Sequence, residues 1–109
     1  MNVIATGLAG LTPKIAASRA ANHILVHADS TGWSACETTN DGSPVRSDEL
    51  LLARGELRVW VLFHAAGAIR TAALRRHRDD EKGGWTETTE SWLRNRDARK
   101  LPTVLDWMD

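Results

Sequence analysis

The chain has 109 residues, of which 42% are hydrophobic and 26% charged, and its formal net charge at pH 7 is zero. This length and composition predict a single globular domain, residues 1–109, that buries roughly two thirds of the surface exposed by its unfolded chain. Zero net charge excludes a general electrostatic attraction to nucleic acid or acidic membranes. Cys36 is the only cysteine, so no internal disulfide can form, and a reducing compartment is expected.

The start of the chain has no basic region followed by a sustained apolar run, and no stretch has the length of a membrane span. We therefore expect a soluble cytoplasmic protein that makes no membrane contact. Residues 54–100 contain eleven basic and seven acidic side chains, a net of +4, while the segments on either side carry −2 each. This distribution indicates a mildly basic centre and not a polybasic tail.

Residues 2–6 suit a short edge strand, and a helix is predicted from Pro13 to about His27. Thr12 would be its N-cap, and proline at the first helical position loses no hydrogen bond. The apolar residues expected on its buried face are Ile15, Ala16, Ala20, Ile24 and Leu25. A turn over residues 29–32 would end the helix.

Two weaker elements are expected next. Residues 33–39 alternate loosely and predict a strand, followed by a loop over residues 40–44. Ser47 and two acids then precede three leucines, and Gly55 follows. That pattern favours a short helix over residues 47–54, with a strand over residues 50–53 as the alternative.

The segment 56–78 predicts a β-hairpin, because a β-branched and aromatic run is followed by a glycine-containing turn and a second alternating run. A three-residue loop over 65–67, with Gly67 left-handed, would place His64 opposite Ala68. One ribbon face is then expected to form the core, with Leu57, Val59, Val61, Phe63, Ile69, Thr71 and Ala73. The other face is mixed and carries Arg58, Trp60, Leu62, Arg70, Ala72 and Leu74.

Residues 85–99 allow two structures. Early acids and a stapling Trp85 favour a helix from about Glu87 to Arg99, whereas the threonines allow a strand over 85–89 paired with the Arg75 end of the hairpin. Pro102 restarts a short C-terminal helix whose packing residues are Val104, Leu105, Trp107 and Met108.

The expected fold is therefore α+β: an N-terminal helix packed on a small antiparallel sheet centred on the hairpin at about 56–78, with C-terminal helical segments. The order helix, three strands, helix is similar to that of the double-stranded-RNA-binding domain. The basic start of that domain's second helix is missing here, so the similarity concerns architecture, and no family is claimed.

The mixed hairpin face is the best candidate for an interaction surface. Tryptophan and arginine on an open sheet can stack on bases and meet phosphates, and they are also frequent anchors of protein interfaces. In the alternative without function, the C-terminal segment covers Trp60 and the arginines extend past it. The candidate interaction residues are Arg58, Trp60, Arg70, Arg75, Arg76, Arg78 and Trp107.

A basic cluster at residues 75–78, together with Arg94, Arg96, Arg99 and Lys100, suggests a phosphate-binding patch. Neighbouring acids favour a locally neutralised, solvated face instead. Those acids are Asp79, Asp80, Glu81, Glu87 and Glu90.

His23 and His27 are four residues apart on the predicted helix, a spacing that can place both rings on one metal ion. No spacing selects a third ligand among Cys36, His64 and His77, so no metal and no cofactor is expected. Cys36 paired with a histidine would be a nucleophile, but a lone cysteine on a strand is more often a small buried hydrophobe.

Three functions follow from these patterns, in this order. The first is a small non-enzymatic regulatory or protein-interaction protein, of the kind that phages and mobile elements carry, which acts through a Trp/Arg surface on an unidentified protein partner or on a second copy as a homodimer. It predicts an exposed apolar patch around Trp60 or Trp107. The second is a nucleic-acid-binding protein that uses the basic and aromatic hairpin face. The third is a small enzyme or ligand binder with a histidine-containing pocket.

Overall fold

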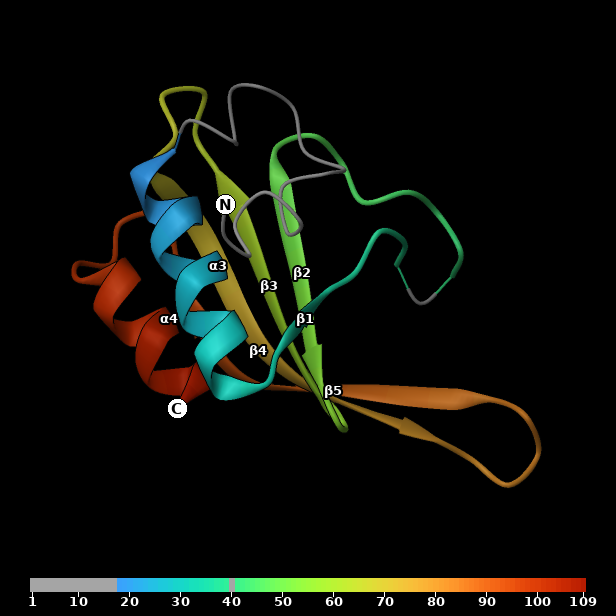
Figure 1. Ribbon diagram of the computed structural model, residues 1–109. Helices are drawn as coiled ribbons and strands as arrows, with labels where there is room; N and C mark the ends of the chain where they lie inside the picture. The colour runs from blue at the N-terminus through green and yellow to red at the C-terminus, as the bar shows by residue number, and fades with distance from the viewer. Residues whose placement is uncertain (1–17, 40) are drawn as a thin grey trace.

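The computed structural model describes residues 18–39 and 41–109, which form an α+β fold in which two helices lie on one face of a five-stranded sheet (Figure 1). The predicted strand at 2–6 and the predicted helix start at Thr12 and Pro13 fall outside these residues. The elements are α3 (Arg19–Thr31), β1 (Ser34–Ala35), β2 (Glu49–Arg54), β3 (Leu57–Phe63), β4 (Ile69–Asp79), β5 (Trp85–Leu93) and α4 (Lys100–Met108).

The sheet is an antiparallel meander in which each strand pairs with the next along the chain, in the order β1-β2-β3-β4-β5. The ends of β4 and β5 project beyond the other strands as a two-stranded arm (Figure 1). Five strands lie between α3 and α4, so the similarity in element order to the double-stranded-RNA-binding domain is wrong. In the described part of the chain, neither helix is long and apolar enough to cross a membrane.

The predicted helix over 47–54 is wrong, and the alternative strand is correct. Glu49–Arg54 form β2, with Leu50 and Leu52 buried in the core and Leu51 on the opposite face. The polar residues before the leucines form a turn, in which the Glu49 N–H donates to the Arg46 carbonyl (3.1 Å). Pairing with β3 therefore overrides the local helix-start signals.

The predicted helix from Glu87 to Arg99 is also wrong. Trp85–Leu93 form β5, which pairs with β4 along its whole length. Threonine and tryptophan favour extended backbone, and the long neighbouring strand β4 supplies a partner for it. The strand predicted over 33–39 is shorter than expected, because only Ser34–Ala35 pair with β2, and an isolated bridge joins Thr38 to Pro44.

The hairpin and its loop are confirmed. The His64 N–H donates to the Ala68 carbonyl (2.8 Å), and Gly67 has φ +95°. The predicted register fails one residue further along. Phe63 opposes Ile69 as expected, but Leu62 opposes Thr71, so Arg70 is an extra residue in β4.

This bulge at Arg70 exchanges the two faces of β4. Thr71 and Ala73, predicted to face the core, lie on the opposite face with Trp60, because Trp60 pairs with Ala73. Ala72 and Leu74 take their places and pack in the core or against it. The β3 faces are as predicted, with Val59, Val61 and Phe63 buried.

The helices supply the other half of the core. The described part of the predicted first helix buries Ala21, Ile24, Leu25 and Ala28. The predicted start is wrong at Ser18, which is extended (ψ 126°) and is the N-cap of a helix that begins at Arg19, and this helix ends at Thr31, four residues beyond the predicted end. The C-terminal helix is confirmed, with Val104 and Met108 buried and Leu105 and Trp107 packed against the core from partly buried positions.

Arg54, at the end of β2, links the carboxyl ends of both helices. Its guanidinium donates to the carbonyls of Thr31 (2.9 Å) and Met108 (3.1 Å) and lies 4.8 Å from the centre of the Trp33 ring. The Trp33 indole N–H also donates to the Met108 carbonyl (2.9 Å). A cation at helix carboxyl ends complements their dipoles, so these contacts hold both helices against one face of the sheet.

The hairpin loop offers a test of this packing. The Ser18 hydroxyl donates to the Gly67 carbonyl (2.5 Å), and a Cβ at Gly67 would lie 3.1 Å from the Ser18 Cβ. Gly67→Ala is therefore expected to lower the free energy of unfolding by about 1–3 kcal/mol, measured by urea denaturation, through left-handed strain and crowding against the helix cap.

Gly42→Ala is the matched control, because Gly42 also has positive φ (+85°) but a Cβ there would meet nothing within 4 Å. The free energy of unfolding should fall more with Gly67→Ala than with Gly42→Ala. Equal losses would contradict the close packing of the loop on α3.

Candidate binding site

The face of the sheet opposite the helices, here called the open face, carries a row of apolar side chains. Leu51, Trp60, Ala73 and Trp92 are successive cross-strand partners on β2 to β5. Both described helices pack on the other face, so the alternative in which the C-terminal segment covers Trp60 is wrong. The open face is therefore a mixed aromatic surface without a covering helix among the described residues.

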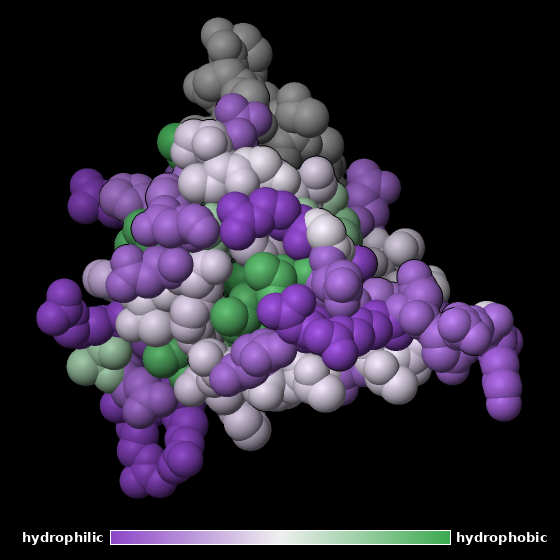
Figure 2. Space-filling model, turned by 90° about the horizontal axis from the view of Figure 1, so that it is seen from below, coloured by the Kyte–Doolittle hydropathy of each residue, from purple (hydrophilic) through white to green (hydrophobic). Residues whose placement is uncertain are grey.

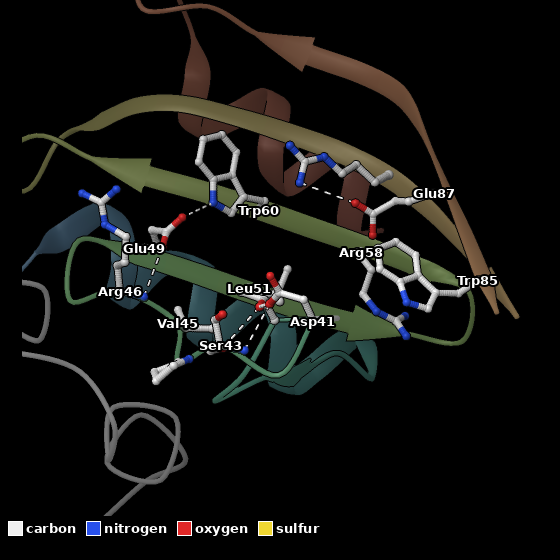
Figure 3. Close-up of a pocket in the computed structure, with 13 residues that line it drawn as sticks. Asp41, Ser43, Val45, Arg46, Glu49, Leu51, Arg58, Trp60, Trp85 and Glu87 are labelled. Carbon is white, nitrogen blue, oxygen red and sulfur yellow. Dashed lines mark hydrogen bonds and ion pairs between the residues drawn. The ribbon is translucent and has the colours of Figure 1, made fainter. Parts of the chain in front are cut away.

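A pocket of about 420 Å³ opens on this face, between the loop at residues 39–46 and the base of the arm (Figure 3). Strands β2 and β3 supply its floor, with Leu51, Arg58 and Trp60. Its charged side chains are balanced: Arg46, Arg58 and Arg75 against Asp41, Glu49 and Glu87. A volume in this range accommodates a small ligand or a few side chains of a partner.

Trp60 is held in place from two sides. Its indole N–H donates to Glu49 Oε2 (2.6 Å), and the Arg75 guanidinium lies 5.3 Å from the centre of its ring. Glu49 Oε1 in turn accepts from the Arg46 N–H (3.1 Å), which links Trp60 to the loop. Because these contacts fix the ring before any ligand arrives, binding would cost little side-chain entropy there.

Arg58 and Trp60 both line the pocket, but Arg70, the third predicted member of this group, does not. The bulge places Thr71 opposite Leu62, where the predicted register has Arg70, and brings Arg75 beside Trp60 in the position opposite Arg58 that the predicted register gives to Leu74. Trp85 and Glu87 also line the pocket and escaped sequence reasoning, because a helix was favoured for their segment. The alternative strand over 85–89, which the threonines allow and which pairs with the Arg75 end of β4, is correct and would have placed them here.

The basic cluster at 75–78 is neutralised locally. Arg75 lies 3.6 Å from Glu87, Arg76 3.0 Å from Glu90, and Arg78 3.1 Å from Glu56. His77 lies 3.1 Å from Asp79 and stacks at 5.4 Å on Trp85. Figure 2, seen from below, shows mostly hydrophilic and intermediate residues, with a hydrophobic patch near the centre and smaller ones along one edge. The cluster is therefore a network of ion pairs and not an unbalanced cationic patch.

The exposed tryptophans differ from those predicted. Trp60 and Trp107 are both partly buried, the latter against the core. Trp92 and Trp85, both on β5, are the exposed ones, at 66% and 46% of their accessible surface. An apolar surface around Trp60 is present, but Trp92 is its most exposed member, and Trp107 lies elsewhere.

The histidines and the cysteine are not brought together. His27 lies 2.6 Å from Asp109 on the helix side, and no group of three or more metal-ligating side chains occurs among residues 18–39 and 41–109. Burial raises the pKa of the Cys36 thiol, and the Arg58 guanidinium partly offsets this. A raised pKa leaves little thiolate, so Cys36 is poorly suited to nucleophilic chemistry.

Comparisons of the chain with protein-family models, with curated proteins and with solved structures give no match. Function is therefore argued from the open face and its pocket.

The pocket loop can be tested by titration. The Thr39 hydroxyl, the Ser43 backbone N–H and the Ser43 hydroxyl donate to the Asp41 carboxylate. These hydrogen bonds, of which the one from Thr39 has the largest effect, hold the pKa of Asp41 below its usual value. We expect Thr39→Val to raise the Asp41 pKa toward that usual value, measured by NMR titration of the carboxyl carbon. The pKa of Asp41 is lower in the folded chain than in the unfolded chain. Ionised Asp41 therefore stabilises the loop at pH values above the pKa of the unfolded chain, and this stabilisation is lost as the pH falls through the pKa of the folded chain.

Thr38→Val is the matched control, because no hydrogen bond joins its side chain to Asp41. It should leave the Asp41 titration unchanged. An ordinary Asp41 pKa in the unsubstituted protein would contradict the loop geometry.

Proposed function

We propose that this protein is a non-enzymatic interaction module that binds a protein partner through the open face of its sheet. The observation that carries the proposal is Trp92, a tryptophan with 66% of its surface exposed, which lies in one cross-strand row with Trp60. Exposed tryptophans on a flat surface are costly in water and are typical anchors of protein interfaces.

The charges support a protein partner over nucleic acid. The pocket balances three arginines with three carboxylates, and each arginine at 75, 76 and 78 has an acidic partner within 3.6 Å. A surface that binds phosphates normally keeps its cations unpaired, because affinity comes from neutralising the backbone. Aromatic residues with paired charges at the rim are instead the composition of a protein interface.

Partner binding can be tested with a photo-reactive benzophenone side chain placed at position 92 of the full chain, in the cells that produce it. We expect irradiation to give a discrete adduct with one protein, since an anchor residue lies within van der Waals distance of its partner. Trp60→Ala in the same chain should strongly reduce the adduct, because it removes the neighbouring anchor.

Val26, which is 48% exposed on α3, is the matched control position. A benzophenone there should not give the same adduct. Adducts that form equally from both positions, or no adduct at 92, would contradict the proposal. An adduct of twice the chain mass would identify a second copy as the partner.

Nucleic acid is the second candidate, supported by the stacking of Arg75 on Trp60. It predicts quenching of tryptophan fluorescence by single-stranded DNA or RNA, with affinity that falls steeply between low and moderate salt. The paired charges lead us to expect no binding in this titration even at low salt.

A further inference from the structure

Arg58 occupies an unusual electrostatic position in the pocket. It is the cross-strand partner of Arg75, so two guanidinium groups of like charge lie on adjacent strands of the open face. Like charges directly opposite each other destabilise a sheet unless a counter-charge is close. Glu87 supplies one carboxylate, and it lies 3.6 Å from Arg75.

Among the described residues, no carboxylate lies within ion-pair distance of Arg58. Its Nη1 donates to the backbone carbonyls of Gly55 (2.7 Å) and Leu57 (2.9 Å), which orients the side chain but leaves its positive charge uncompensated. The residue is only partly exposed, so water screens this charge less than it would on an open surface. The other two arginines of the pocket are paired, Arg46 with Asp48 (3.2 Å) and Arg75 with Glu87.

The acids that line the pocket are already engaged. Asp41 accepts from Thr39 and Ser43, and Glu49 accepts from Trp60 and the Arg46 N–H. Rearranging them to reach Arg58 would break these hydrogen bonds. The Arg58 guanidinium is therefore available to form an ion pair with a carboxylate supplied by a ligand.

Part of the pocket wall is apolar and aromatic, beside the hydroxyl-bearing Thr39 and Ser43. Leu51 and Val45 line it together with Trp60 and Trp85, and Figure 3 shows Arg58 and Trp85 toward one end of the pocket in this view and Trp60 toward the other. An anionic group at Arg58 would thus be accompanied by an apolar group over the aromatic wall. The volume of about 420 Å³ suits two adjacent side chains of an extended segment.

We propose that the pocket binds an acidic side chain of the partner, with the Asp or Glu carboxylate on Arg58 and an adjacent apolar side chain against Trp85, at the same end of the pocket. This inference rests on the proposed function and adds the chemistry of the partner segment. Arginine is suited to this role because its planar guanidinium can hold a carboxylate through two parallel hydrogen bonds.

The test uses the full chain and two dipeptide probes, N-acetyl-Leu-Glu-amide and its neutral counterpart N-acetyl-Leu-Gln-amide. Two-dimensional NMR follows the indole N–H signals of Trp60 and Trp85 and the Nε–H signal of Arg58 during each titration. We expect the acidic probe to shift the Arg58 and Trp85 signals more than the signal of Trp60 at the other end of the pocket, and the neutral probe to bind about tenfold more weakly, as the loss of a charged hydrogen bond implies.

Arg58→Gln should abolish the preference for the acidic probe, while Arg70→Gln should retain it. Arg70 is the matched control, because it is an exposed arginine of the same sheet that does not line the pocket. The spectrum of each variant reports at once whether the fold is kept. Should Arg58→Gln lose the fold, Arg58→Lys, which keeps the charge but not the planar fork, is expected to bind the acidic probe with reduced affinity.

Equal binding of the two probes, no binding of either, or a preference that survives Arg58→Gln would overturn the proposal. Larger shifts with inorganic phosphate than with the acidic probe would overturn the assignment to a carboxylate. These outcomes are independent of the adduct at position 92. A partner could be captured there while the pocket rejects the acidic probe, in which case only the carboxylate inference fails.

Discussion

The register of the β3–β4 pair is the constraint on which the rest of the structure depends. One extra residue at Arg70 shifts every later residue of β4 to the other face of the sheet. Ala72 and Leu74 thereby reach the core beneath the helices, and Ala73 and Arg75 reach the open face. Without the bulge, Arg75 would face the helices, where a guanidinium would be costly to bury, and Trp60 would lose the cation above its ring.

The two faces of the sheet differ in packing, because the helices cover one face and the pocket opens on the other. Arg54 holds the carboxyl ends of α3 and α4 against one face, so both helices contribute to the same core. The other face is bordered by the loop at 39–46, which Glu49 links to Trp60, and by the base of the arm, where Glu87 pairs with Arg75. The proposed recognition of a protein segment rests on this aromatic surface and on Arg58, for which the described residues supply no ion-pair partner.

The local sequence pattern predicted an element correctly where the structure that it favours is also the one that packs best against the rest of the protein. The loop with Gly67, the alternation in β3 and the C-terminal helix, predicted from Pro102 and observed over Lys100–Met108, belong to this group. The segments 47–54 and 85–93 carry acids and caps that favour helix starts, and they became strands because a neighbouring strand was available, which is not visible in a local window. The bulge could not be predicted, since Arg70 is neither glycine nor a turn former. Arg58, Trp60 and Arg75 were named in advance as interaction residues, Arg75 also as part of the basic cluster, while Trp85 and Trp92 were not named as surface residues.

The measurement that tests this account most directly is the set of cross-strand backbone NOEs between β3 and β4 in the isotopically labelled protein. The bulged register predicts contacts that join Trp60 to Ala73 and Val61 to Ala72, with Phe63 still opposite Ile69. These contacts would place Arg75 beside Trp60 on the open face. Contacts that join Trp60 to Ala72 and Val61 to Thr71 would show an uninterrupted register, return Arg75 to the helix side, and contradict both the pocket and the surface proposed for the partner.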